Sequence, residues 1–193
     1  KRRKKPEPVY KCINPMLADA DRSQLKDKRY LKQYVLQEKF DGTRGILYKR
    51  GNSIKGIIAR SCTSDFLDNF PEIVAEAQLL PVRSCTLDGE ITFFNRIGNP
   101  FYLTAKATQS ARKGYTARYM VFDVLDVDGV SMQDKPLWQR LKVLKQIIPS
   151  SLKHIKVVKT YETPSQYERI YKKIVKRKGE GVMLKKKTSP YVA

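Results

Sequence analysis

The chain is poor in the residues that several kinds of site require. Its 193 residues include a single histidine, His154, and three widely spaced cysteines, Cys12, Cys62 and Cys85. One histidine gives little support to a histidine-based catalytic triad, and the cysteine spacing matches no zinc-binding pattern. An odd number of scattered cysteines is typical of a reduced, intracellular protein whose thiols are buried or idle.

Long hydrophobic runs are also missing. No apolar stretch reaches the length that crosses a bilayer, and no signal-peptide pattern is present. We therefore expect an intracellular protein that is not bound to a membrane. The first residue is Lys1 and not a methionine, so we expect the chain to be a part of a longer protein.

Acidic residues are scarce relative to basic ones. The 19 Asp and Glu residues stand against 39 Lys and Arg, which gives a formal net charge of +20. This imbalance does not help folding, because like charges repel each other in the compact state. It suits a polyanion, since cations that displace counterions from phosphates favour binding. We expect a nucleic-acid partner; an anionic membrane surface is less favoured because no basic amphipathic helix stands out, and a basic protein that is merely soluble is the third option.

The order of apolar segments predicts one mixed α/β domain in which strands and helices are interleaved. The segment 117–127 is an almost continuous apolar run, which indicates a strand buried on both faces. Segments 34–40 and 44–50 are predicted to form a strand pair around Gly42, and Gly179 is predicted to end the last helix. The other predicted strands are 54–59, 86–94, 155–160 and 182–184; the predicted helices are 21–33, 71–80, 136–148 and 164–178, and 101–113 is ambiguous.

Residues 1–8 form a basic, proline-containing lead-in. We interpret this segment as a linker or an arm, with a nuclear-type address or a phosphate-binding role as alternatives. Residues 9–193 are then the folded domain.

One short motif, K-x-D-G-x-R at residues 39–44, is the most informative feature of the chain. It follows an apolar strand-like run and places Lys39 close to a glycine, which lets the backbone approach a ligand closely. A deprotonated lysine is a nucleophile that can form a covalent intermediate. The alternative is an ordinary solvated turn between two strands, because Asp-Gly is a common hairpin turn.

Four further clusters follow in order, each where a strand meets a turn: residues 60–61, 87–90, 122–125 and 180–185. The order and spacing of the five clusters resemble the motifs of the covalent nucleotidyltransferase family. This family contains ATP-dependent DNA ligases, RNA ligases and mRNA capping guanylyltransferases. The Ser-Pro-Tyr at 189–191 and the Phe-Asp-Val-Leu at 122–125, followed by Asp-Gly at 128–129, resemble the DNA-ligase branch in particular.

The resemblance covers about residue 14 to the end and implies a fold. This fold is an α/β (α+β) nucleotidyltransferase (ATP-grasp-like) domain with mixed, largely antiparallel sheets flanked by helices. It also implies that the C-terminal part of the domain and a following oligonucleotide-binding (OB) barrel lie beyond residue 193. We expect this chain to be a monomer. Without the barrel, it is expected to adenylate itself slowly and to seal nicks poorly.

The resemblance also implies roles for single residues. Lys39 is the expected catalytic nucleophile, which attacks the α-phosphate of ATP and holds AMP. Phe122 is expected to stack on adenine, and Glu90 to bind the ribose hydroxyls. The expected ATP- and AMP-binding residues are Gln37, Glu38, Lys39, Arg44, Arg60, Glu90, Phe122 and Lys185; Glu90 and Glu180 are the expected ligands of Mg²⁺ (or Mn²⁺), and Asp41 and Gly42 are expected to support them.

Each of these residues also has an ordinary structural explanation. Phe122 fits a core position of an apolar strand, and Glu90 fits a turn. Arg60 fits an exposed surface, and Lys185 fits an exposed basic run. Two positions depart from the family pattern: Gln37 stands where many ligases have a glutamate, and residues 59–62 read Ala-Arg-Ser-Cys where the family often has Ser-Arg and a nearby glycine.

The leading hypothesis is an ATP-dependent DNA ligase that seals nicks in double-stranded DNA through a lysyl-AMP intermediate. An RNA ligase or an mRNA capping guanylyltransferase with the same chemistry is the nearest alternative. A non-catalytic basic module that binds nucleic acid is the alternative from another class.

Overall fold

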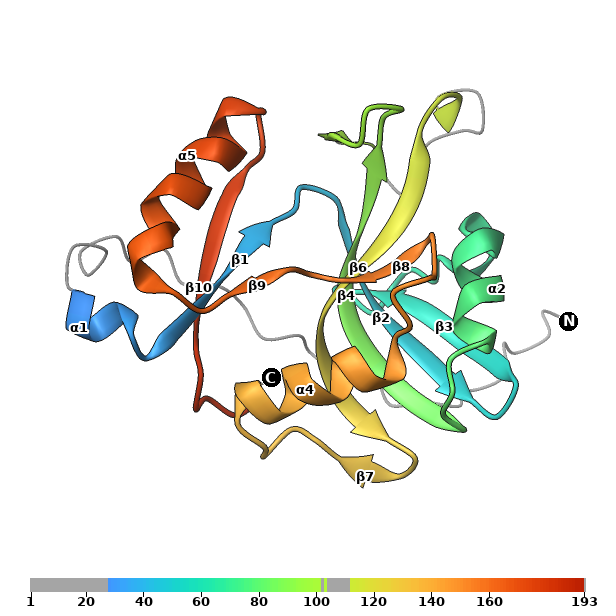
Figure 1. The fold of residues 1–193 in the computed structure, drawn as a ribbon. Helices are drawn as coiled ribbons and strands as arrows, with labels where there is room; N and C mark the ends of the chain where they lie inside the picture. The colour runs from blue at the N-terminus through green and yellow to red at the C-terminus, as the bar shows by residue number, and fades with distance from the viewer. Residues whose placement is uncertain (1–27, 102, 104–111, 193) are drawn as a thin grey trace, which may run out of the picture.

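The computed structural model describes residues 28–101, 103 and 112–192. Two sheets lie next to each other, and each carries its own helices (Figure 1). This arrangement confirms the predicted mixed fold with largely antiparallel sheets. Three predicted segments lie wholly or partly outside the described residues: the lead-in at 1–8, the first part of the helix 21–33 and most of the ambiguous segment 101–113. The described end of the predicted helix 21–33 contains α1, which spans Lys28–Leu31.

The larger sheet has β2 and β4 near its centre. Its strand order is β3 (Ser53–Ala59), β2 (Thr43–Arg50), β4 (Ser84–Phe94), β6 (Thr116–Val127) and β7 (Val130–Ser131), all antiparallel. Two short strands extend it: β5 (Pro100–Phe101) pairs with β4, and β8 (Ile155–Val157) runs parallel to β6.

The smaller sheet consists of β10 (Gly181–Lys186), β1 (Tyr34–Lys39) and β9 (Thr160–Tyr161), with β1 in the middle. The predicted pairing of segments 34–40 and 44–50 is therefore wrong. Both edges of β1 are paired within the smaller sheet, and both edges of β2 are paired with β3 and β4. The motif at 39–44 thus forms the crossing between two sheets and not a hairpin turn.

Gly42 fixes how closely this crossing packs on the larger sheet. A Cβ atom at Gly42 would lie 2.3 Å from the carbonyl oxygen of Ile91 and 2.7 Å from Oγ1 of Thr92. Any larger residue would push the crossing away from β4. Glycine is thus required here for packing against a strand, whereas the sequence suggested close approach to a ligand.

Three helices lie where the apolar spacing predicted them. α2 (Pro71–Gln78) has proline in its first turn, and α4 (Leu137–Ile147) buries Leu141 and Leu144 against the larger sheet. Two short 3₁₀ turns, η1 (Leu67–Asn69) and η2 (Pro164–Gln166), precede α2 and α5 respectively. α5 (Tyr167–Lys176) covers the smaller sheet through Ile170 and Ile174.

The last helix ends where predicted, but for a different reason. The residue with positive φ is Lys178, at +63°, and not Gly179. Gly179 donates its N–H to the carbonyl of Ile174 at 3.0 Å, and a Cβ atom on it would lie 2.7 Å from Cγ2 of Ile174. The glycine is needed because the chain passes close to the helix, while the lysine accepts the left-handed conformation.

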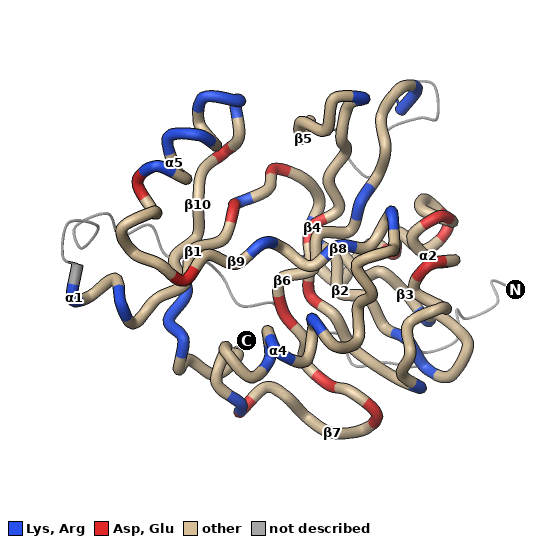
Figure 2. The backbone as a smooth tube through the Cα atoms, in the orientation of Figure 1, with Lys and Arg blue, Asp and Glu red and all other residues tan. Residues whose placement is uncertain are grey.

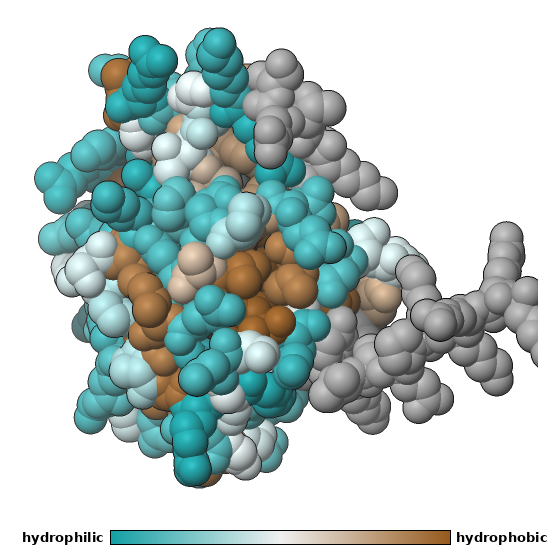
Figure 3. Space-filling model, turned by 90° about the vertical axis from the view of Figure 1, so that its right-hand side faces the viewer, coloured by the Kyte–Doolittle hydropathy of each residue, from teal (hydrophilic) through white to brown (hydrophobic). Residues whose placement is uncertain are grey.

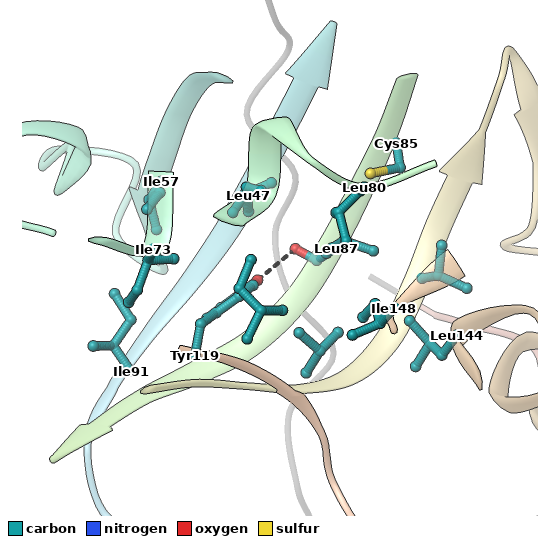
Figure 4. Close-up of a cluster of buried hydrophobic side chains, with 14 of the residues drawn as sticks. Leu47, Ile57, Ile73, Leu80, Cys85, Leu87, Ile91, Tyr119, Leu144 and Ile148 are labelled. Carbon is teal, nitrogen blue, oxygen red and sulfur yellow. Dashed lines mark hydrogen bonds between the residues drawn. The ribbon is translucent and has the colours of Figure 1, made fainter. Parts of the chain in front are cut away.

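The main core lies between the larger sheet and the helices α2 and α4 (Figure 4). Tyr119 of β6 is fully buried there, and its hydroxyl oxygen is 2.8 Å from the carbonyl oxygens of both Gly45 and Leu87. Its neighbour Met120 is buried in a separate cluster with Phe94. Burial of β6 on both faces is therefore confirmed.

The face of the molecule seen in Figure 3 is mostly hydrophilic, with hydrophobic side chains gathered near its middle. No helix in the described ranges is long and apolar enough to span a bilayer. Cys85 is a free, buried thiol as predicted.

A buried lysine ties β2 to the end of α2. Lys49 is only 2% exposed, and its ammonium lies 3.3, 2.6 and 3.0 Å from the carbonyl oxygens of Ala77, Gln78 and Leu80. The last carbonyls of a helix lack partners within the helix, so this ammonium satisfies them.

Replacing Lys49 with methionine should lower the free energy of unfolding by about 1–3 kcal/mol, because three carbonyl oxygens near the end of α2 each lose a charged donor. Lys55→Met on the neighbouring strand β3 is the matched control, since Lys55 is exposed; its effect should stay within about 0.5 kcal/mol. Urea unfolding followed by circular dichroism measures both. Equal midpoints for the two variants would contradict a capping role for Lys49.

Candidate active site

The site lies where the chain crosses from the smaller sheet to the larger one. Lys39 is the last residue of β1, and the register pairs it with Gly181 at the start of β10. This register brings Glu180 beside it, and the ammonium of Lys39 forms an ion pair with the Glu180 carboxylate. The two side chains are 43% and 36% exposed, so a ligand can reach both.

Glu90 belongs to β4 of the larger sheet. It lies opposite Arg44 in the register of β2 and β4. Burial raises the pKa of Glu90 to about 7, against the lowering effect of Arg44; Asp88 and Asp41 raise it further, and Lys39 lowers it. A carboxylate that responds to Lys39 and Asp41 shares their electrostatic environment. Arg44 and Glu90 thus lie side by side on the larger sheet, and Lys39 and Asp41 lie near enough to influence the charge of Glu90.

Phe122 projects from an irregular point of β6. The pairing of β4 with β6 shifts between Asp88 and Gly89, so that Asp88 pairs with Asp123, Gly89 pairs with Val121, and Phe122 has no partner. Such bulges are common beside functional sites because they redirect a side chain. Phe122 is half-buried at the margin of the cluster around Phe94 and is not a fully buried core residue.

Two cations lie over the ring of Phe122. The Arg44 guanidinium is 5.1 Å and the Lys185 ammonium 4.3 Å from the ring centroid. Burial lowers the pKa of Lys185 to about 8, with Asp123 and Asp88 opposing this shift. The residue as a whole is half-buried, but its ammonium rests on the aromatic face, where it is poorly hydrated. Lys185 is thus part of the site and not an exposed lysine of a basic run.

Gln37 and Glu38 lie on opposite faces of β1, as neighbours in a strand do. Gln37 is 1% exposed; its Nε2 donates to Oγ1 of Thr160 at 2.9 Å, and its Oε1 has no hydrogen-bond partner in the described part of the chain. Glu38 forms an ion pair with Arg177, next to α5, and burial raises its pKa although Arg177 opposes this. The structure does not bring Glu38 to the group around Lys39, so its role in nucleotide binding stays a prediction.

Arg60 lies in the turn after β3, whose last residue, Ala59, pairs with Gly45 next to Arg44. Its side chain is exposed, and among the described residues no hydrogen bond or ion pair holds it. Arg60 thus lies at the same end of the sheet as the site, and its contact with a nucleotide also remains a prediction.

Sequence reasoning missed a buried carboxylate behind the site. Asp88 is fully buried and accepts from Arg44 twice, at 3.0 Å from Nε and 2.6 Å from Nη2. The hydroxyl of Tyr191 donates to the same carboxylate at 2.7 Å. Burial raises the pKa of Asp88, while these donors counteract the shift. The ion pair of Asp88 with Arg44 fixes the orientation of the Arg44 guanidinium beside Phe122.

A second buried ion pair lies one strand away. Arg140 of α4 is fully buried, with its Nε 2.7 Å and its Nη2 3.1 Å from the carboxylate of Asp123. Its Nη1 donates to the carbonyl of Ser189 at 2.9 Å. The signals for both networks were in the sequence: an aspartate inside each of two apolar strands, and the Ser-Pro-Tyr at 189–191.

A divalent cation has a restricted set of donors here. No group of three or more His, Cys, Asp and Glu side chains that could hold a metal occurs among residues 28–101, 103 and 112–192. Glu90 and Glu180 both lie near Lys39. Mg²⁺ typically uses one or two carboxylates and completes its shell with water and substrate phosphates. The two carboxylates therefore fit a cation that arrives with a nucleotide.

Comparison with known proteins gives one family. The model of the ATP dependent DNA ligase domain matches residues 15–193. A probable DNA ligase of Sorangium cellulosum is 30% identical over 96% of this chain and 36% of the relative. DNA ligase 2 of Methanosarcina mazei is 28% identical over 95% of this chain and 34% of the relative. The chain spans about a third of the length of these relatives.

Solved structures agree on the fold. The ligase domain of LigD from M. tuberculosis has a TM-score of 0.64 at 18% identity, covering 83% of this chain and 50% of that one. The Chlorella virus DNA ligase-adenylate has a TM-score of 0.58 at 15% identity, covering 93% and 63%. Since the family model covers nearly the whole chain, this protein belongs to the ATP dependent DNA ligase domain family.

Proposed function

We propose that this chain is the adenylation domain of an ATP-dependent DNA ligase. Its parent protein would seal nicks in double-stranded DNA through a lysyl-AMP intermediate on Lys39. The observation that carries the proposal is the meeting of Lys39 and Glu180 from the smaller sheet with Glu90, Arg44 and Phe122 from the larger one.

The residues around Lys39 suit the parts of a nucleotide. The half-buried ring of Phe122 offers a face for adenine, and stacking of a base on an aromatic ring contributes about 1–3 kcal/mol. The Lys185 ammonium lies over that ring, so it must move aside when the base binds. The Arg44 guanidinium stays on Asp88 beside the ring, where it can reach the phosphates. The buried Oε1 of Gln37, without a partner among the described residues, is a suitable acceptor for the exocyclic amine of adenine.

The proposed first step needs a neutral amine on Lys39. Lys39 leaves Glu180, loses its proton to solvent and attacks the α-phosphorus of ATP. A nitrogen–phosphorus bond forms, the bond to the β-phosphate oxygen breaks, and pyrophosphate leaves. Arg44 and Lys185 stabilise the negative charge of the transition state as fixed cations. A divalent cation near Glu90 and Glu180, Mg²⁺ or Mn²⁺, would supply further charge stabilisation.

The next two steps belong to the longer parent protein. AMP passes from Lys39 to a 5′-phosphate at the nick, and the 3′-hydroxyl then displaces AMP to close the strand. We propose that the parent acts inside the cell as a monomer, with the rest of this domain and an OB barrel supplied by residues beyond this chain. The relatives, about three times as long as this chain, leave room for such domains.

Incubation with ATP and Mg²⁺ should add one AMP to this chain, seen in the intact mass. Lys39→Ala should abolish the adduct, because the attacking nitrogen is gone. Lys55→Ala, an exposed lysine on β3, is the matched control and should form the adduct at the normal rate. GTP in place of ATP should give no adduct. An adduct that survives in the Lys39→Ala variant would overturn the proposal.

Nucleotide binding should be strongest between pH 7 and 8, because the pKa of Glu90 is raised to about 7 and that of Lys185 is lowered to about 8. Below this window Glu90 is protonated and accepts ribose hydroxyls poorly. Above it Lys185 loses its positive charge and attracts phosphate weakly. Titration calorimetry with a non-reactive ATP analogue at several pH values measures the affinity.

Two variants separate the limbs of this profile. Glu90→Gln should remove the acid limb and Lys185→Arg the alkaline limb, since arginine stays charged throughout this range. A wild-type affinity that does not change between pH 6 and 9 would contradict the assignment of these groups.

A further inference from the structure

The exposed face of α5 carries a continuous basic stripe. Four cations lie on a single face, because Arg169 and Lys176 are each three and four residues away from the adjacent pair Lys172 and Lys173; all four are exposed. This face lies opposite the buried Tyr167, Ile170 and Ile174. Figure 2 shows the basic residues along α5, on the side of the molecule away from the larger sheet. α5 is thus a basic amphipathic helix, so the expectation that no such helix stands out is wrong.

Helix stability does not account for the stripe. Like charges four residues apart, as in Arg169 and Lys173 or Lys172 and Lys176, destabilise a helix by about 0.2–0.5 kcal/mol for each pair. The ion pair of Lys172 with Glu168 is exposed on both sides and adds little. The helix dipole favours cations in the last turn, which includes Lys173 and Lys176 but not Arg169 in the first turn.

The C-terminal end of the stripe is close to the site along the chain, while α5 itself packs on the face of β1 opposite to Lys39. α5 ends at Lys176, the chain turns tightly at Lys178, and Glu180 then pairs with Lys39. The exposed Lys178 extends the basic surface toward this ion pair. Seven residues of helix cover about 10 Å, a length along which duplex DNA presents about six phosphates.

We propose that the outer stripe of α5, Arg169, Lys172, Lys173 and Lys176, binds the phosphate backbone of duplex DNA beside the nick that is presented to Lys39. This inference rests on the proposed function and names the surface that holds its substrate. An anionic membrane is the less suitable partner, because the apolar face of α5 is already buried on the smaller sheet and cannot insert into lipid.

The test compares two variants of equal charge. The stripe variant carries Arg169→Gln, Lys172→Gln, Lys173→Gln and Lys176→Gln. The control carries Arg83→Gln, Lys55→Gln, Lys142→Gln and Lys145→Gln, four exposed cations on other elements. Binding of each to a nicked duplex is measured by fluorescence anisotropy over a range of salt concentrations.

Each phosphate contact contributes about 0.9 to the slope of log K against log salt, so the stripe variant should have a slope shallower by about 3 to 4. Its affinity at low salt should fall at least tenfold, while the control should keep a slope close to that of the wild type. Replacing the three stripe lysines with arginine should preserve the slope. Equal slopes for the stripe and control variants would overturn the inference.

Adenylate formation separates this inference from the proposed function. The stripe variant should take AMP from ATP at the wild-type rate, since the stripe touches no nucleotide. Failure of the wild type to form the adduct would count against the proposed function and would leave the DNA measurement valid. Stripe-dependent binding to phosphatidylserine vesicles, without a stripe-dependent effect on DNA, would also overturn the inference.

Discussion

The buried carboxylate of Asp88 is the interaction on which the rest of the arrangement depends. It lies in the central strand β4 and accepts hydrogen bonds from Arg44 of β2 and from Tyr191 of the C-terminal segment. The Arg44 bond lies within the larger sheet, whereas the Tyr191 bond joins the segment that follows β10 to the larger sheet. Breaking a buried ion pair by removing one partner costs about 3–5 kcal/mol, so the guanidinium of Arg44 is firmly held beside Phe122.

The chemistry of the site follows from this junction. Lys39 and Glu180 belong to the smaller sheet, whereas Glu90 and Phe122 belong to the larger, and neither sheet alone has a complete set of groups. Lys185 of β10 reaches the ring of Phe122 across the junction. The same burial that holds these groups together moves the pKa values of Glu90 and Lys185 toward neutrality, the range in which groups that bind or transfer phosphate work.

The sequence predicted most strands and helices because their apolar spacing is regular, and it predicted the grouping of Lys39, Arg44 and Glu90 from motif order. It did not predict that β1 and β2 belong to different sheets, since strand pairing depends on contacts with segments far away in the chain. The sequence also did not predict that Glu38 lies on the face of β1 opposite to Lys39. Alternation shows that neighbouring residues lie on opposite faces of a strand, but it does not show which face is turned toward the site. The capping of α2 by Lys49 was also not predicted, because it depends on a contact between segments that are far apart in the chain.

A crystal structure of this chain with a non-reactive ATP analogue tests the central claim most directly. We expect adenine on the ring of Phe122, the ribose at Glu90, and the α-phosphate within attacking distance of the Lys39 amine. A nucleotide bound elsewhere on the basic surface, with the Lys39–Glu180 pair undisturbed, would contradict it.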